Sequence, residues 1–174
     1  ARYLTPDPLT SSVVGHALAG LFEMGPQAIA GFVAGGPAGA AALVGGIQGN
    51  KAMQLAADQG VDPGTAVGLG LVQGGTAALG AVMPMHLAPM LTAGFGAGTR
   101  VAANVAFGAA NQSAFGMASR GITADLLETR GYPDMAAQYK AIDKGAIAAD
   151  IIMGGAFGAF GHGMALRAER QQQK

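Results

Sequence analysis

The chain has 174 residues, which is enough for one domain with its own core. Glycine (30) and alanine (38) dominate it, whereas charged residues supply only 11%, against roughly 25% in typical soluble domains. Ten basic residues balance ten acidic ones, which excludes an overall field that would attract nucleic acid or anionic lipid. The absence of cysteine excludes disulfides and thiolate metal sites.

The first half of the chain begins with residues 1–12, which we interpret as an extended lead-in to a helix beginning near Val13. Residues 24–50 carry no charge, and small residues recur there at three- or four-residue steps, which predicts one face of a helix. Pro26 fits the first turn of a helix. Pro37 is expected to kink or divide it.

Asp62 and Pro63 form the clearest helix start, because a carboxylate N-cap precedes a proline at the first helical position. The segment that they open is uncharged as far as Thr99. Pro84 and Pro89 interrupt it, so we predict two apolar helices joined by a proline-bounded turn.

The last third holds most of the charge. An uncharged run at 101–119 is followed by an amphipathic region, roughly 122–150, and by a further uncharged run at 151–166. We therefore divide the chain after the lead-in into a Gly/Ala-rich apolar helical region, 13–120, and amphipathic helices with a C-terminal apolar helix and a charged end, 121–174. Strand patterns are poor throughout. The expected fold is all-α, with apolar helices and helical hairpins packed in an oligomeric assembly.

Glycines four residues apart recur in three of the four uncharged runs. This GxxxG spacing lets two helix backbones approach closely. Compositional bias is the alternative explanation, since many such pairs arise by chance in a chain rich in glycine and alanine. The glycines expected to pack helices are Gly31, Gly35, Gly39, Gly45, Gly49, Gly64, Gly68, Gly70, Gly74, Gly94, Gly98, Gly154 and Gly158.

The uncharged runs of 27, 37 and 19 residues reach or approach the length of a membrane span, which is about 20 residues. Alanine and glycine dominate them, however, and residues that drive insertion strongly are sparse. Conditional insertion, or burial inside an oligomer, is therefore favoured over constitutive multi-pass insertion.

Three polar residues of the third run, Arg100, Asn104 and Asn111, share one helix face because they lie four and seven residues apart. This face could line a wet lumen or bond to neighbouring helices. A solvent-facing stripe on a soluble helix is an equal alternative.

Signals of catalysis are absent from the sequence. His16, His86 and His162 lie far apart, and none has a carboxylate or a second histidine at a metal-ligand spacing. The Gly-rich strings GFGAGT and GLGLVQGG lack the preceding strand and the acidic partner of a dinucleotide loop. We expect no catalytic residue, metal or cofactor, and no enzymatic activity.

One resemblance covers roughly the first half of the chain. It is carried by YLTPDPLTSS at 3–12, by residues 58–65 with their Gly-Val-Asp, and by the Gly-rich helix that ends at 83–85. These segments resemble a region of the very large internal virion proteins of short-tailed bacteriophages, the DNA-ejection proteins. The chain would then be a segment of a much larger polypeptide. It has no lysozyme-like or transglycosylase part.

The resemblance implies storage in the virion interior near the portal, beside other virion proteins, and release into the host cell envelope at infection. There the chain would form a ring-like homo-oligomer, contact the host membrane conditionally, and help build a conduit through which DNA passes without specific binding. The competing hypotheses are a cellular multi-pass channel or export component and a soluble helical interaction scaffold.

Overall fold

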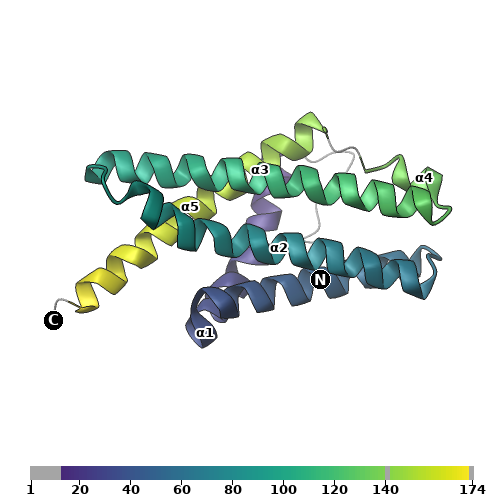
Figure 1. The fold of residues 1–174 in the computed structure, drawn as a ribbon, viewed down its shortest axis with the longest axis horizontal. Helices are drawn as coiled ribbons and strands as arrows, with labels where there is room; N and C mark the ends of the chain where they lie inside the picture. Colours follow the sequence, from purple (N-terminus) through teal and green to yellow (C-terminus); the bar gives the residue numbers. More distant parts are fainter. Residues whose placement is uncertain (1–12, 140–141, 173–174) are drawn as a thin grey trace.

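The structure, a computed structural model, describes residues 13–139 and 142–172 (Figure 1). Its helices are α1 (Val13–Asp58), α2 (Pro63–Thr92), α3 (Ala97–Thr129), α4 (Pro133–Ala136) and α5 (Lys144–Gln172). These residues include no strand, so the predicted all-α fold is confirmed. Helices α2 and α3 run side by side along the long axis, and α5 crosses them obliquely. The expected lead-in at 1–12 lies outside the described residues.

Helix α1 is two helical segments that fold back on each other at Gly35 and Gly36. Gly36 has φ 62° and ψ −152°, a conformation that residues with a Cβ rarely adopt. Pro37 then opens the second segment, where its missing N–H leaves no intrahelical bond unmade. The predicted division at Pro37 is confirmed. The prediction that Pro26 lies in the first turn of a helix is wrong, because this helix already begins at Val13.

Helix α2 begins as predicted. Asp62 is its N-cap, with a side-chain oxygen that accepts a hydrogen bond from the backbone N–H of Thr65 at 3.1 Å, and Pro63 is the first helical residue. The tyrosine hydroxyl of Tyr132 also bonds Asp62, accepting from its backbone N–H at 2.8 Å. The start of α2 is thereby tied to the loop that follows α3.

The predicted proline-bounded turn is wrong, because α2 continues through Pro84 and Pro89 and ends at Thr92. Pro84 has no N–H to donate to the carbonyl of Gly80, four residues earlier. The side-chain amide of Asn111 on α3 donates to that carbonyl instead, at 3.2 Å. A neighbouring helix therefore satisfies the acceptor that the proline leaves open, and the helix can continue.

The turn between α2 and α3 lies at residues 93–96, beyond the prolines. Arg100 donates from Nη2 to the carbonyl oxygens of Ala93 and Phe95, at 3.3 and 3.2 Å. A cation is favourable there because the C-terminal carbonyls of a helix carry partial negative charge.

The compact apolar core lies at the end of the molecule where the α1–α2 turn meets α3 and α4. Its buried members are Ala56, Val61, Ala66, Leu69, Leu127 and Ala136. Helices α1 and α3 are each followed, two residues beyond their last residue, by a glycine with positive φ, Gly60 at 82° and Gly131 at 87°, after which the chain turns into this core. Helix α3 runs through the boundary predicted between residues 120 and 121, so the two predicted regions share a helix.

Candidate functional site

Glycines hold the second segment of α1 against α2. A Cβ added to Gly45 would lie 2.7 Å from the carbonyl oxygen of Gly74, and one added to Gly49 would lie 2.7 Å from that of Gly70. In the other direction, a Cβ added to Gly70 would lie 2.8 Å from the carbonyl oxygen of Gly49, and one added to Gly74 would lie 2.6 Å from that of Gly45. The two backbones are therefore in direct contact, which any larger residue would prevent.

A second glycine contact joins α3 to α5. Gly154 packs against the backbone of Gly108, and Gly158 packs against the backbone of Asn104 and Val105. A third contact closes the hairpin within α1, where a Cβ on Gly31 would lie 2.5 Å from the carbonyl oxygen of Gly39. The fold thus contains two tightly packed helix pairs, α1–α2 and α3–α5.

Other predicted packing glycines have different surroundings. Gly35, Gly94 and Gly98 have no atom within 4 Å of an added Cβ, so these three glycines do not pack helices within the chain, and packing there between copies stays a prediction. Gly35 lies at the break in α1, Gly94 lies in the α2–α3 turn, and Gly98 is the second residue of α3. Gly64 meets only the Asp62 side chain at 3.2 Å, and Gly68 meets the flexible end of Leu126 at 3.1 Å.

The predicted polar face of α3 points at neighbouring elements of the same chain. Asn104 is 3% exposed; its oxygen accepts from the Thr92 hydroxyl at 3.2 Å, and its nitrogen bonds Nδ1 of His162 on α5 at 3.0 Å. Asn111 bonds α2, and Arg100 bonds the α2–α3 turn. These bonds match one of the alternatives for this face, namely contact with neighbouring helices.

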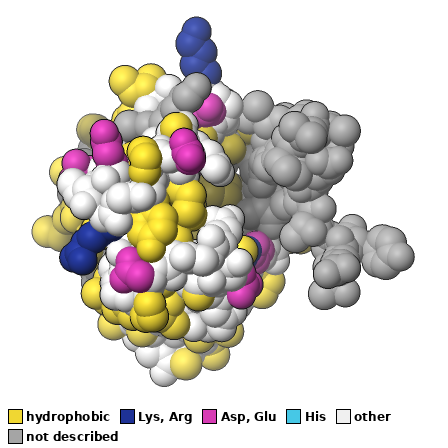
Figure 2. Space-filling model, turned by 90° about the vertical axis from the view of Figure 1, so that its right-hand side faces the viewer, with side chains coloured by type: hydrophobic (Ala, Val, Ile, Leu, Met, Phe, Trp, Pro, Cys, Tyr) yellow, Lys and Arg dark blue, Asp and Glu magenta, His cyan; other side chains and the backbone are white. Residues whose placement is uncertain are grey.

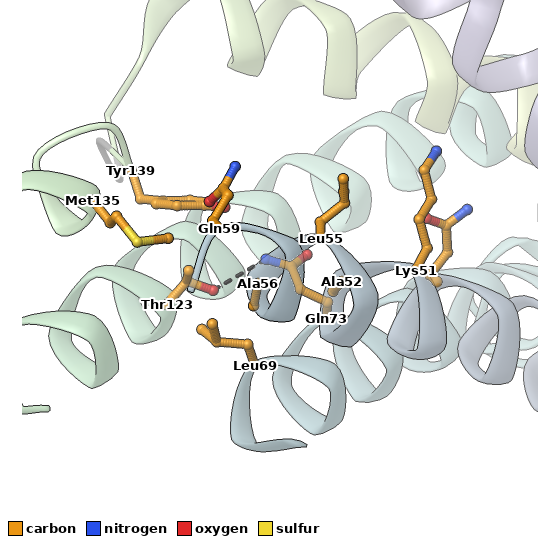
Figure 3. A pocket seen from close by; sticks show the side chains of 11 residues that line it. Lys51, Ala52, Leu55, Ala56, Gln59, Leu69, Gln73, Thr123, Met135 and Tyr139 are labelled. Carbon is orange, nitrogen blue, oxygen red and sulfur yellow. Dashed lines mark hydrogen bonds between the residues drawn. The ribbon is translucent and has the colours of Figure 1, made fainter. Parts of the chain in front are cut away.

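Polar side chains also line a cleft between the two helix pairs. One cavity of about 260 Å³, the Lys51 cavity, is shown in Figure 3. Gln73 of α2 donates across it to the hydroxyl of Thr123 on α3, at 3.0 Å. Lys51 lies at its edge and pairs with Glu23 of the first α1 segment at 2.8 Å, an exposed ion pair worth about 0–1 kcal/mol.

A second cavity of about 320 Å³, the Arg120 cavity, shares Gln48, Gln73 and Tyr139 with the first. Here Nη1 of Arg120 on α3 pairs with Asp150 of α5 at 3.0 Å, and both side chains are mostly buried. Burial raises the pKa of Asp150, while the hydrogen bond and charge of Arg120 oppose that rise. Gly116 packs directly against the Asp150 carboxylate. A larger residue at position 116 would require the Asp150 side chain to shift.

Large apolar side chains, in contrast, lie mainly outside. Twenty of those that the structure describes are exposed, including Phe22 (79%), Val33 (81%) and Leu71 (72%), whereas only Val44, Val61, Leu69 and Leu127 are buried. Figure 2 shows hydrophobic side chains spread between the few charged ones over one end of the molecule. Small and polar residues form most of the interior, a distribution opposite to that of ordinary soluble domains.

Two described stretches are long and apolar enough to cross a membrane, Phe22–Asp58 and Pro63–Pro84. Within the described part of the chain, no cluster of three His, Asp or Glu side chains has the geometry of a metal site. His162 bonds Asn104, as described above; the side chains of His16 and His86 lie outside those that the structure describes.

Sequence reasoning missed two groups of residues in this site. Gly108 and Gly116 lack the four-residue spacing to another glycine, so the GxxxG pattern passes over them. The Arg120–Asp150 pair joins residues thirty positions apart on different helices. The usable signal was three glutamines within uncharged runs, Gln48, Gln73 and Gln112, which all line the cleft.

Comparison of the chain with protein-family models, with curated proteins and with solved structures found no match.

Proposed function

We propose that this chain is a membrane-entering structural protein whose glycine-packed helices help to build a conduit, with their polar cleft inside and their apolar side chains against lipid. The observation that carries the proposal is the inverted distribution of side chains. Exposed large apolar residues far outnumber buried ones among those described, the buried polar residues are mostly Thr and Ser, and half-buried glutamines line the cleft.

The dimensions of the α1–α2 pair support this proposal. The second segment of α1, residues 37–58, is antiparallel to the candidate span Pro63–Pro84 of α2, a helix that continues to Thr92. Each of these two stretches is about 33 Å long at 1.5 Å per residue. The hydrocarbon core of a bilayer is about 30 Å thick. The glycine contact lies near the middle of both stretches, and small residues at such a contact let helices pack closely in lipid.

The resemblance to DNA-ejection proteins extends the proposal. The chain would be carried in the virion interior near the portal and would leave with the genome at infection. In the host envelope, several copies would then surround a passage for DNA as a ring-like homo-oligomer. Glycine-based contacts suit such a change of surroundings, because close backbone packing does not depend on whether water or lipid covers the outer face.

Site-directed fluorescence tests membrane entry directly. The chain contains no cysteine, so one introduced cysteine can carry an environment-sensitive dye. In Leu71→Cys the dye sits on an exposed apolar position of α2, and in Gln138→Cys it sits on an exposed position outside both candidate spans. With phospholipid vesicles, the dye at position 71 should shift to the blue and trapped solute should leak, whereas the dye at 138 should stay in water.

The oligomer is measured in the same preparation. Mass photometry of detergent-solubilised vesicles should give one discrete multiple of the chain mass. If the dye at position 71 is unchanged by vesicles, the solute is retained and the chain stays monomeric, the conduit proposal is wrong. A discrete oligomer in water with no response to vesicles would instead favour the soluble scaffold.

A further inference from the structure

Two residues that line the Arg120 cavity, Ser119 and Arg120, carry buried donors that no described part of the fold uses. Of the three guanidinium nitrogens of Arg120, only Nη1 is bonded, to Asp150. Nε and Nη2 are buried and have no hydrogen-bond partner among the described residues. The hydroxyl of Ser119, a residue only 6% exposed, is likewise buried without a partner, and both residues line the cavity.

Leaving such groups unpaired is costly. A buried polar group without a partner destabilises the fold because it has lost its hydrogen bonds to water, and a charged group does so more strongly. Ser119 and Arg120 belong to the same helix, α3, and both line the same cavity. Native structures usually satisfy buried donors of this kind with water or with a ligand.

The unpaired atoms of Arg120 have a specific geometry. Nε and Nη2 form one edge of the planar guanidinium, and their two N–H groups point the same way. This edge matches the two oxygens of a carboxylate in a bidentate pair. The remaining polar lining, from Gln48, Gln73, Gln112 and Thr76, is uncharged and can bond the rest of a small polar molecule.

We propose that the Arg120 cavity binds a small monoanionic carboxylate, held by the Nε–Nη2 edge of Arg120 and by the hydroxyl of Ser119. The volume of about 320 Å³ suits a small metabolite and lies at the lower end of ligand-pocket sizes. Asp150 selects for low charge, because the Arg120–Asp150 pair is neutral and a dianion would add more repulsion than a monoanion. The proposal concerns the packed chain in water and does not depend on membrane entry.

Acetate is the probe, titrated at constant ionic strength against sodium chloride. The signals are the melting temperature and the ¹⁵N–¹H resonance of the Arg120 Nε in the full chain. Both should change saturably with acetate. Arg120→Lys keeps the charge and the partner of Asp150 but removes the planar edge, so it should weaken acetate binding at least about tenfold. Ser119→Ala should weaken it several-fold.

Arg130→Lys is the matched control, because Arg130 is exposed at the end of α3 and lies outside the cavity; it should bind acetate as the parent chain does. If Arg120→Lys does not fold, the Nε resonance of the parent chain and the Ser119→Ala affinity decide the question. The proposal is overturned if acetate produces no saturable change, which would mean that water alone fills the cavity. Equal binding by Ser119→Ala and the parent chain, with no Nε shift, would also overturn it. Inorganic phosphate binding more tightly than acetate would overturn the choice of a monoanionic carboxylate.

Discussion

The hydrogen bond from the side-chain amide of Asn111 to the carbonyl of Gly80 should contribute to the stability of the fold only because residue 84 is proline. Pro84 cannot donate to that carbonyl, and the Asn111 amide does so at 3.2 Å. Asn111→Leu keeps a similar side-chain volume and removes the donor. Gly80 is buried, so its carbonyl should be left without a partner, at a cost of about 1–3 kcal/mol.

Pro84→Ala tests the reason for this cost, because it restores a backbone N–H that can reach the Gly80 carbonyl. In the Pro84→Ala background, Asn111→Leu should cost less than about 0.5 kcal/mol, which gives a coupling energy of about 1–2 kcal/mol in the double-mutant cycle. For a chain of this size, 2 kcal/mol corresponds to a melting temperature change of about 4–8 °C.

Urea denaturation followed by far-UV circular dichroism measures all four proteins of the cycle. Parallel melting curves check that each remains helical and unfolds in one step. The explanation is refuted if Asn111→Leu lowers the free energy of unfolding equally in the parent chain and in the Pro84→Ala background. The Asn111 amide would then stabilise the fold by some contact other than its bond to the Gly80 carbonyl.

Three further predictions concern the glycine contacts and the two perturbed carboxyl groups. Gly74→Ala should destabilise the chain by about 1–3 kcal/mol because its Cβ would lie 2.6 Å from a carbonyl oxygen, whereas Gly75→Ala, with nothing within 4 Å, should stabilise it by up to about 1 kcal/mol; equal urea midpoints would contradict this. Donors on Thr65 lower the pKa of Asp62, so its stabilisation is present above the unfolded-state pKa of about 3.8 and is lost as pH falls through the folded value. Asp62→Asn should therefore reduce the loss of stability on acidification, measured by urea midpoints between about pH 2 and 5. The pH dependence that Asp150 contributes has the opposite sign. Burial raises its pKa, so the stability of the fold decreases as pH rises from the unfolded-state pKa of about 3.8 through the pKa of the folded state. Asp150→Asn should remove that fall, and an unchanged pH profile would show that Asp150 is not the group responsible.

Local signals in the sequence determined where several elements begin and divide. The Asp62–Pro63 start follows from one carboxylate and one proline whose preferences are local, and the break before Pro37 follows from glycines that tolerate positive φ. The all-α class follows in the same way from composition and from the absence of strand patterns. Each of these features depends on residues within a few positions of each other.

Contacts between distant segments decided the rest. Pro84 reads locally as a helix end, but it lies inside α2 because Asn111 on another helix supplies the missing donor. The GxxxG spacing could not separate Gly74, which touches another backbone, from Gly94 and Gly98, which touch none, because spacing places residues on a face without saying what that face meets. The Arg120–Asp150 pair depends on the packing of α3 against α5. Sequence thus determined the helices and the small-residue faces, while tertiary packing alone decided which faces meet and which polar groups lie inside.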